Sequence, residues 1–148
     1  MSKFTIIIPV YNEAKNLKIL VPKIYKELKN IIFELIIVDD NSSDETCNVL
    51  KKFKKNNFRH IIRKGGKDLS QSCVLGFKNS KYDKIIVMDG DLQHNPNDIK
   101  KFLISYDNNK VDIIVGSRDL FKNKKHNLNF FRLFASRLLV LIINFFLG

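Results

Sequence analysis

The chain has 148 residues, of which 45% are hydrophobic, and it carries a formal net charge of +11. This composition fits one folded domain and excludes a compositionally disordered chain. The positive charge favours anionic partners, namely nucleic acid, nucleotide phosphates or acidic lipid headgroups. The two cysteines, Cys47 and Cys73, form no CxxC pair. Their placement argues against a zinc site or a disulfide framework and for reduced thiols in the cytoplasm.

Short apolar runs alternate with helical patterns along the chain. Several runs consist of consecutive Ile and Val residues, which suit strands of a parallel sheet that is covered on both faces. Five strands are predicted, at Phe4–Val10, Leu35–Asp39, His60–Arg63, Lys84–Asp89 and Asp112–Ser117.

Helical patterns fill the gaps between these runs. The first helix is predicted from an apolar stripe that runs from Leu17 to Leu28, and the second from an N-cap at Ser43 and a stripe that reaches Phe53. A third helix contains Val74–Phe77, and a fourth begins at Asn95-Pro96. The order predicts the α/β class, with an open, Rossmann-like, mostly parallel sheet flanked by helices.

The last part of the chain differs from the rest. Residues 128–148 are almost wholly apolar apart from Arg132 and Arg137, whereas residues 1–127 carry the alternating pattern. We therefore expect a domain over 1–127 and an apolar or amphipathic C-terminal helix over 128–148. Its wholly apolar part is about half of the ~20 residues that a membrane span requires. A helix at the membrane interface and a helix that packs on a missing part or a partner fit this segment equally well.

Ligands of open α/β sheets bind beyond the carboxyl ends of the strands. The first run is followed by Tyr11, which could stack on a base, and by Glu13, which could accept from a ribose hydroxyl. A plain strand-to-helix turn capped by Asn12 explains these residues equally well. The second run ends in Asp39 and Asp40. They suit hydrogen bonds to a ribose or a base, although helix capping and solvated loop charge are the alternative.

The fourth run ends in the strongest local signal, Asp89-Gly90-Asp91, followed by Gln93. Two carboxylates at i and i+2 can project to one side of an extended segment, and Gly90 lets the backbone approach a ligand closely. Carboxylate oxygens with an amide nearby suit Mg²⁺ or Mn²⁺ that bridges a diphosphate. Such a triplet also occurs by chance, but its position after a buried strand favours the metal interpretation.

Two basic segments could contact phosphates. Lys67 lies in a glycine-containing basic loop before the third helix, and Arg118 follows the fifth run. Lysine and backbone N–H groups at such a loop can hold a phosphate, although a flexible solvated loop is an equally good interpretation. The loop does not match the P-loop pattern.

These motifs together resemble the family 2 glycosyltransferases of the GT-A fold, and specifically the dolichyl-phosphate mannosyltransferase-like group. The matching segments are IIIPVYNEAKNL at 6–17, IIVDDNSSDET at 36–46, VMDGDLQHNP at 87–96, VGSRD at 115–119 and FFRLFASR at 130–137. The resemblance implies a nucleoside pocket, a metal and a set of phosphate contacts. It assigns Pro9, Tyr11, Glu13 and Asp40 to the nucleoside, Asp89 to the sugar-nucleotide, Asp91 and Gln93 to the metal, and Arg118, Arg132 and Arg137 to the donor diphosphate or the acceptor phosphate.

The chain departs from the family pattern in two places. A glycine-rich stretch of the form GLGxA reads here as Asp68-Leu69-Ser70-Gln71-Ser72, which puts a negative charge where donor phosphates could pass. The chain also ends at Gly148, before the further strands and the acceptor-side segment of the family. We therefore expect a fragment, one part of a split gene or a degenerate remnant.

The resemblance implies metal-dependent, inverting transfer of a hexose from GDP-mannose or a UDP-sugar to a polyprenyl or dolichyl phosphate. A phosphate acceptor needs no general base, whereas a sugar hydroxyl does. The expected setting is peripheral, at the cytoplasmic face of a membrane, with a separate subunit or a missing C-terminal part as a further partner. A polysaccharide- or protein-directed transferase and a noncatalytic nucleotide-sugar-binding module remain alternatives. Nucleic acid is not expected, because no aromatic–basic interleaving is present.

Overall fold

Four strands and four helices alternate within residues 3–109 and 111–116, the part of the chain that the computed structural model describes. Their order confirms the predicted α/β class, and residues 1–114 form one compact unit. The elements are β1 (Phe4–Val10), α1 (Ala14–Glu27), β2 (Phe33–Asp39), α2 (Thr46–Lys51), β3 (Phe58–Ile62), α3 (Leu69–Asn79), β4 (Ile85–Val87) and α4 (Asp98–Asn108).

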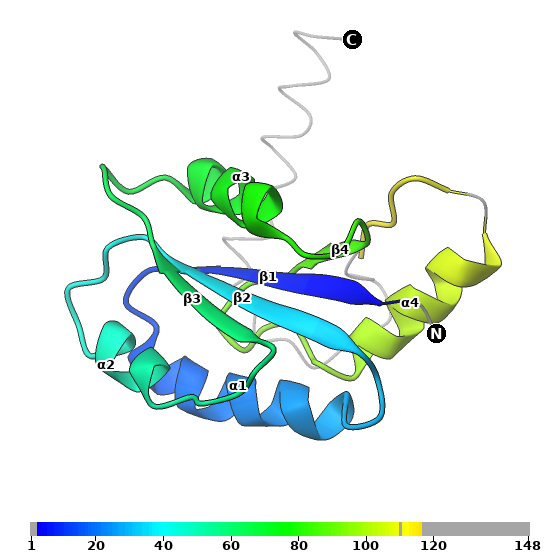
Figure 1. The fold of residues 1–148 in the computed structure, drawn as a ribbon, viewed down its shortest axis with the longest axis horizontal. Coiled ribbons are helices and arrows are strands. Elements are labelled where there is room, and N and C mark those ends of the chain that lie inside the picture. The colour runs from blue at the N-terminus through cyan, green and yellow to red at the C-terminus, as the bar shows by residue number, and fades with distance from the viewer. Residues whose placement is uncertain (1–2, 110, 117–148) are drawn as a thin grey trace, which may run out of the picture. The chain divides into compact units, whose positions relative to one another are not determined.

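The strands form a parallel sheet in the order β3-β2-β1-β4. From β1 the chain winds through α1 and α2 to β3, and it then returns across the opposite face through α3 to β4. Figure 1 shows α3 on one face of the sheet and α1 and α2 on the other. The strand order therefore reverses between β1 and β4, and an open sheet binds ligands at such a switch point.

The two central strands are buried along their whole length, which explains their runs of Ile and Val. Side chains of β1 and β2 alternate between two apolar clusters. The larger cluster joins the sheet to α1, α2 and α4, and the smaller one consists of Ile7, Ile36 and Val38 with Ile61 and Leu75 packed against them. The sheet is thus covered on both faces, as the sequence predicts.

The predicted fifth strand is wrong for the residues that the structure describes. Residues 112–116 have irregular backbone, and Ile113 is 78% exposed. The edge position of β4 and the exposure of Ile113 give the physical reason: apolar, β-branched composition favours a strand only where a pairing partner and burial are available. Strand β4 is also shorter than its predicted run and ends at Val87.

Two predicted helix starts are wrong by two or three residues. Helix α2 begins at Thr46 rather than after Ser43, and the backbone N–H of Ser43 donates to Asn12 Oδ1 at 2.9 Å. Helix α4 begins at Asp98, because a turn in which the Asp98 N–H donates to the Asn95 carbonyl precedes it. The Ser43 hydroxyl donates to Asn12 in the loop after β1, and the Asn95 side chain accepts from the Asn97 N–H, so neither side chain caps its helix.

The predicted C-terminal helix over 128–148 lies outside the described residues. Among the helices of the described part, none has both the length and the apolar character that a membrane crossing requires.

Helix α3 approaches the sheet closely at Gly76. A Cβ atom at this position would lie 2.5 Å from Ile7 Cγ2 and 3.1 Å from Ile7 Cδ1, and Ile7 is fully buried. We expect Gly76→Ala to lower the free energy of unfolding by about 1–2 kcal/mol, because an overpacking cost of roughly 1–3 kcal/mol exceeds the gain in helix propensity. Urea denaturation measures the change. Gly66→Ala is the control and should be nearly neutral, since nothing lies within 4 Å of its added Cβ; equal losses in both variants would contradict the packing argument.

Candidate functional site

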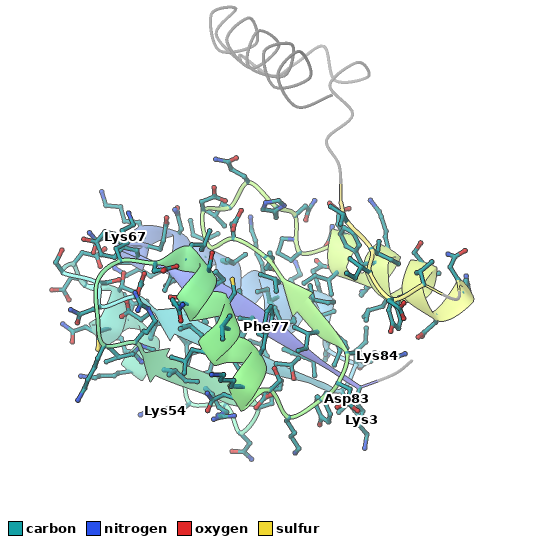
Figure 2. All side chains as sticks on the ribbon, turned by 90° about the horizontal axis from the view of Figure 1, so that it is seen from above. Lys3, Lys54, Lys67, Phe77, Asp83 and Lys84 are labelled. Carbon is teal, nitrogen blue, oxygen red and sulfur yellow. The ribbon has the colours of Figure 1, made fainter. Side chains whose placement is uncertain are left out.

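A cavity of about 250 Å³ opens at the carboxyl ends of β1, β2 and β4, beside the start of α3. It lies at the switch point of the sheet, where the topology predicts a ligand. Figure 2 shows the lining residue Lys67 at one end of the sheet and Lys3, Asp83 and Lys84 at the other. The lining residues are Pro9, Val10, Tyr11, Glu13, Asp40, Lys67, Leu69, Ser72, Asp89, Gly90 and Asp91.

The structure brings together most of the residues predicted from the sequence. Seven of them line this one cavity, namely Pro9, Tyr11, Glu13, Asp40, Lys67, Asp89 and Asp91. Asp39 and Gln93 are not among the lining residues. Arg118, Arg132 and Arg137 lie outside the described residues, so their predicted roles stay predictions.

Asp40 is held at the cavity wall by two groups from other elements. It is 5% exposed, and its Oδ1 accepts from Arg63 Nε at 2.5 Å. Its Oδ2 accepts from the backbone N–H of Asp68 at 2.6 Å. Arg63 stands beside Asp40 because the parallel register pairs Asp39 with Ile62, one residue earlier on each strand. The carboxylate is therefore fixed in orientation, and its buried charge is compensated.

Asp68, the acidic departure from the family pattern, serves as the N-cap of α3. Its side chain accepts from the Gln71 N–H at 3.0 Å, as N-cap carboxylates do. A carboxylate at a helix N-terminus is also favoured by the helix dipole. The negative charge thus has a structural partner within its own helix.

Lys67 and Tyr11 both line the cavity and contact each other. Lys67 Nζ lies 4.2 Å from the centre of the Tyr11 ring, within the range of a cation–π contact. Both side chains are exposed, so such a contact is weak and easily exchanged for another. The pair offers an aromatic face and a cation at the same wall.

The loop after β4 presents its two carboxylates differently. Asp89 Oδ2 lies 3.2 Å from His94 Nε2, and Asp91 Oδ1 accepts from the Gln93 N–H at 2.9 Å. Burial raises the pKa of the Cys73 thiol, and the nearby charge of Asp89 raises it further, which places Asp89 toward α3. Gly90 is buried, and a Cβ there would lie 2.9 Å from Val10 Cγ1. This glycine therefore lets the loop pack under the end of β1.

The oxygen atoms of this loop fit a divalent cation that arrives with a diphosphate. The described residues contain no group of three or more His, Cys, Asp or Glu side chains that could enclose a metal by themselves. Mg²⁺ commonly binds through one or two carboxylates together with substrate phosphates, and Mn²⁺ has similar preferences. Asp89 and Asp91 both border the cavity and supply that number of carboxylates.

Asp39 braces the loop that follows β2. It is 1% exposed, and its Oδ1 accepts from both the backbone N–H and the hydroxyl of Ser42, at 2.9 and 2.5 Å. Ser42 in turn accepts from the Asn12 N–H at 2.9 Å, which joins this loop to the loop after β1. Asn12 and Asn41 both have a positive φ, which asparagine tolerates well. The polar cluster after β2 therefore acts largely as a scaffold.

The pKa of Asp39 makes this scaffold sensitive to acid. Burial by itself raises this pKa, but the nearby His60 and the hydrogen bonds from Ser42 outweigh it, so the pKa lies below its ordinary value of 3.8. Asp39 thus contributes stability that is present above about pH 3.8 and is lost as the pH falls through the lowered pKa. We expect the free energy of unfolding, measured by urea denaturation between pH 2 and 7, to fall less steeply in acid for Asp39→Asn than for wild type. Asp83→Asn, at an exposed position, controls for the change in charge; identical acid slopes for wild type and Asp39→Asn would contradict the assignment.

Two polar residues, Arg63 behind the cavity wall and Ser72 in its lining, were not predicted as site residues. Arg63 appears in the sequence only as part of a basic loop, and its pairing with Asp40 depends on the register between β2 and β3. Arg63 could have been found from its position, because a basic residue that directly follows one strand can pair with a carboxylate at the end of the neighbouring strand. Ser72 gives no sequence signal apart from its place in the altered glycine-rich stretch.

Comparison with known proteins identifies the family. The model of glycosyl transferase family 2 matches residues 5–145. Dolichol-phosphate mannosyltransferase of Pyrococcus furiosus is 38% identical over 136 residues, which cover 91% of this chain and 38% of that protein. The enzyme of the same name from Mycosarcoma maydis is 32% identical, with 77% of this chain and 41% of that protein covered. The chain thus spans about two fifths of the length of these relatives.

Solved structures support the fold at low sequence identity. Residues 1–349 of TarS from S. aureus align with a TM-score of 0.63 and 20% identity, over 82% of this chain and 40% of that one. The mannosyltransferase PcManGT from Pyrobaculum calidifontis, solved with GDP-Man and Mn²⁺, aligns with a TM-score of 0.60 and 17% identity, over 70% of this chain and 31% of that one. With the family model matching nearly the whole sequence, the chain belongs to glycosyl transferase family 2.

Proposed function

We propose that this chain forms the donor site of a glycosyltransferase that moves a hexose from a nucleotide-sugar to a polyprenyl phosphate, with inversion at the anomeric carbon. The observation that carries the proposal is the cavity at the switch point, where an aromatic ring, a fixed carboxylate, a lysine and two metal-compatible carboxylates meet. The relatives named dolichol-phosphate mannosyltransferase support a mannose donor, and PcManGT, solved with GDP-Man, makes GDP-mannose the first donor to test.

The nucleoside is proposed to bind beside Tyr11, Glu13 and Asp40. Tyr11 is 37% exposed and offers an aromatic surface for stacking, and Pro9 lines the same cavity. A base that stacks on Tyr11 displaces Lys67 from the ring, and the freed ammonium can then contact the donor diphosphate. Donor binding would thus exchange a weak internal contact for two contacts with the ligand.

The diphosphate is proposed to bind at the loop after β4. Asp91 would hold the divalent metal, with Gln93 and Asp89 beside it, and the metal would neutralise charge on the leaving nucleoside diphosphate when bound. The structure of PcManGT contains both GDP-Man and Mn²⁺, which supports a divalent ion at this position. Asp89 would face the sugar end of the donor, since its carboxylate is 55% exposed at the cavity.

The acceptor is proposed to be a polyprenyl phosphate at the cytoplasmic face of a membrane. The names of the relatives support this acceptor, and the net charge of +11 favours an anionic surface. Arg118, Arg132 and Arg137 would offset the repulsion between donor and acceptor phosphates. Because the acceptor is already ionised near neutral pH, the reaction would need no general base.

Isothermal calorimetry tests the donor site. GDP-mannose, UDP-glucose and UDP-GlcNAc are titrated into the chain with Mn²⁺ or with EDTA. We expect one of the three to bind with Mn²⁺ and to bind much more weakly with EDTA. If none binds under either condition, the proposal fails.

A transfer assay then tests the acceptor. The preferred donor, radiolabelled in its sugar, is incubated with the chain and dolichyl phosphate in detergent, and transfer is followed by extraction into organic solvent. Labelled lipid supports the lipid acceptor. Donor binding without labelled lipid would overturn that acceptor for this chain and would favour a binding module or a transferase directed at polysaccharide or protein.

A further inference from the structure

Ser72 carries a buried hydroxyl that has no hydrogen-bond partner. The residue is fully buried in the first turn of α3, and it is one of the residues that line the cavity. Serine in a helix commonly returns its hydroxyl to the carbonyl four residues earlier. Here the Asp68 carbonyl accepts the backbone N–H of Ser72 at 3.1 Å, whereas the hydroxyl remains unpaired. Buried hydroxyls nearly always find a partner, so this one calls for an explanation.

Packing of α3 on the sheet does not explain the hydroxyl. In the glycine-rich pattern GLGxA that this family resemblance implies, the position of Ser72 is taken by alanine. Close packing at this helix is instead provided by Gly76, one turn further along and directly over Ile7. The hydroxyl is therefore a feature of this chain that the fold does not need and that costs stability while it is unpaired.

Ser72 is linked to the part of the cavity wall that Asp40 forms. Its backbone N–H bonds to Asp68, and the Asp68 N–H bonds to Asp40 Oδ2 at 2.6 Å. Asp89 and Asp91 follow β4, and the charge of Asp89 acts on Cys73, the next residue of α3, which points in another direction because successive helix positions are about 100° apart. If the donor diphosphate lies at Asp91, the part of the donor near Asp40 is the nucleoside.

We propose that the Ser72 hydroxyl hydrogen-bonds to the nucleoside of the bound donor and so contributes to the choice among nucleotides. The inference rests on the proposed donor site. Rotation about the Cα–Cβ bond redirects the hydroxyl at low cost, since serine has several staggered positions open to it. A hydroxyl can both donate and accept, so it discriminates between bases and riboses by the polar group that they present. A binding site strongly rejects a wrong ligand when that ligand leaves a polar group of the site without a hydrogen-bond partner.

The test is Ser72→Ala, measured by calorimetry with GDP, UDP, ADP and CDP in the presence of Mn²⁺. We expect the affinity for the preferred nucleotide to fall about tenfold, which corresponds to ~1.4 kcal/mol, and the differences among the four nucleotides to shrink. The urea midpoint of the ligand-free protein should stay unchanged or rise, because an unpaired buried hydroxyl has been removed. Ser70→Ala, in the same turn but exposed, is the matched control and should alter neither quantity.

Three results would overturn the inference. Equal affinity of wild type and Ser72→Ala for every nucleotide would show that the hydroxyl makes no ligand contact, while the donor site itself would stand. A lower urea midpoint together with an equal loss for all four nucleotides would assign Ser72 a structural role. Failure of wild type to bind any nucleotide or nucleotide-sugar would overturn the donor site, and this inference with it.

Discussion

Replacing Asp91 with asparagine is expected to abolish the Mn²⁺-dependent part of nucleotide-sugar binding. The proposed metal position has two carboxylates, Asp89 and Asp91, and the described residues contain no group of three or more His, Cys, Asp or Glu side chains that could hold a metal, so each carboxylate contributes a large share of the attraction for a divalent ion. Asparagine keeps the size of the side chain and can still accept from the Gln93 N–H, so the loop should keep its shape. We expect the affinity in Mn²⁺ to fall at least about tenfold, or ~1.4 kcal/mol.

The metal dependence of the loss distinguishes this explanation from a general electrostatic effect. With EDTA, Asp91→Asn should bind the donor as well as wild type or slightly better, because one negative charge near an anionic ligand has been removed. Asp83→Asn makes the same change in charge at the opposite end of the sheet and should leave both affinities unchanged (Figure 2). Wild-type affinity of Asp91→Asn in Mn²⁺, measured by the same calorimetry, would refute the proposed role of Asp91.

The central sheet was predictable from the sequence, whereas its edges were not. Strands β1 and β2 are buried on both faces, so nearly every position in them selects for an apolar side chain and the pattern is unambiguous. Strand β4 lies at an edge, where Ile85 and Val87 are partly exposed, and the run at 112–117 has the same Ile/Val composition. Composition cannot tell which of two such runs finds a pairing partner, because pairing is decided by tertiary structure.

The candidate site also has one part that could be predicted from the sequence and another that could not. The cavity could be anticipated because parallel strands bring their carboxyl ends to one edge, which is why Tyr11, Asp40 and Asp89 meet. The use of each polar group could not be anticipated. Asp39 and Asp40 are adjacent and look equivalent in the sequence, yet one braces a loop through Ser42 and the other lines the cavity with Arg63. Their side chains point in different directions because successive residues of an extended segment alternate.

A second expected result concerns Glu34, which lies at the other end of the sheet from the cavity. This carboxylate is 5% exposed, and its Oε2 accepts from Thr5 Oγ1 at 3.0 Å and from the Lys81 N–H at 2.8 Å. Its Oε1 lies 3.3 Å from Arg59 Nη1, and Arg59 Nη1 also donates to the Asn79 carbonyl at 2.6 Å. One buried carboxylate therefore joins β1, β2, β3 and the connection from α3 to β4.

Glu34→Ala is expected to lower the free energy of unfolding by about 3 kcal/mol, because the buried Thr5 hydroxyl and the Lys81 N–H lose their acceptor and an unsatisfied buried group costs roughly 1–3 kcal/mol. Glu34→Gln should cost less, since its carbonyl oxygen can still accept. Arg59→Met should cost only about 1 kcal/mol, because Arg59 is 45% exposed and its ion pair is screened. Urea denaturation gives all three values, and a loss below about 1 kcal/mol for Glu34→Ala would contradict this account.

The consequence of Glu34→Ala should extend to β4. This strand pairs with β1 over only three residues, from Ile85 to Val87, and the connection that Glu34 holds leads directly into it. In native-state hydrogen exchange we expect the Met88 amide, which donates to the Ile7 carbonyl at 3.1 Å, to lose protection beyond the global loss. Leu35, whose N–H donates to the Asn57 carbonyl between β2 and β3, provides the reference for global unfolding. Because Asp89 and Asp91 follow β4 directly, a β4 that opens locally would also weaken Mn²⁺-dependent donor binding, whereas a purely global loss would leave binding by the folded fraction unchanged.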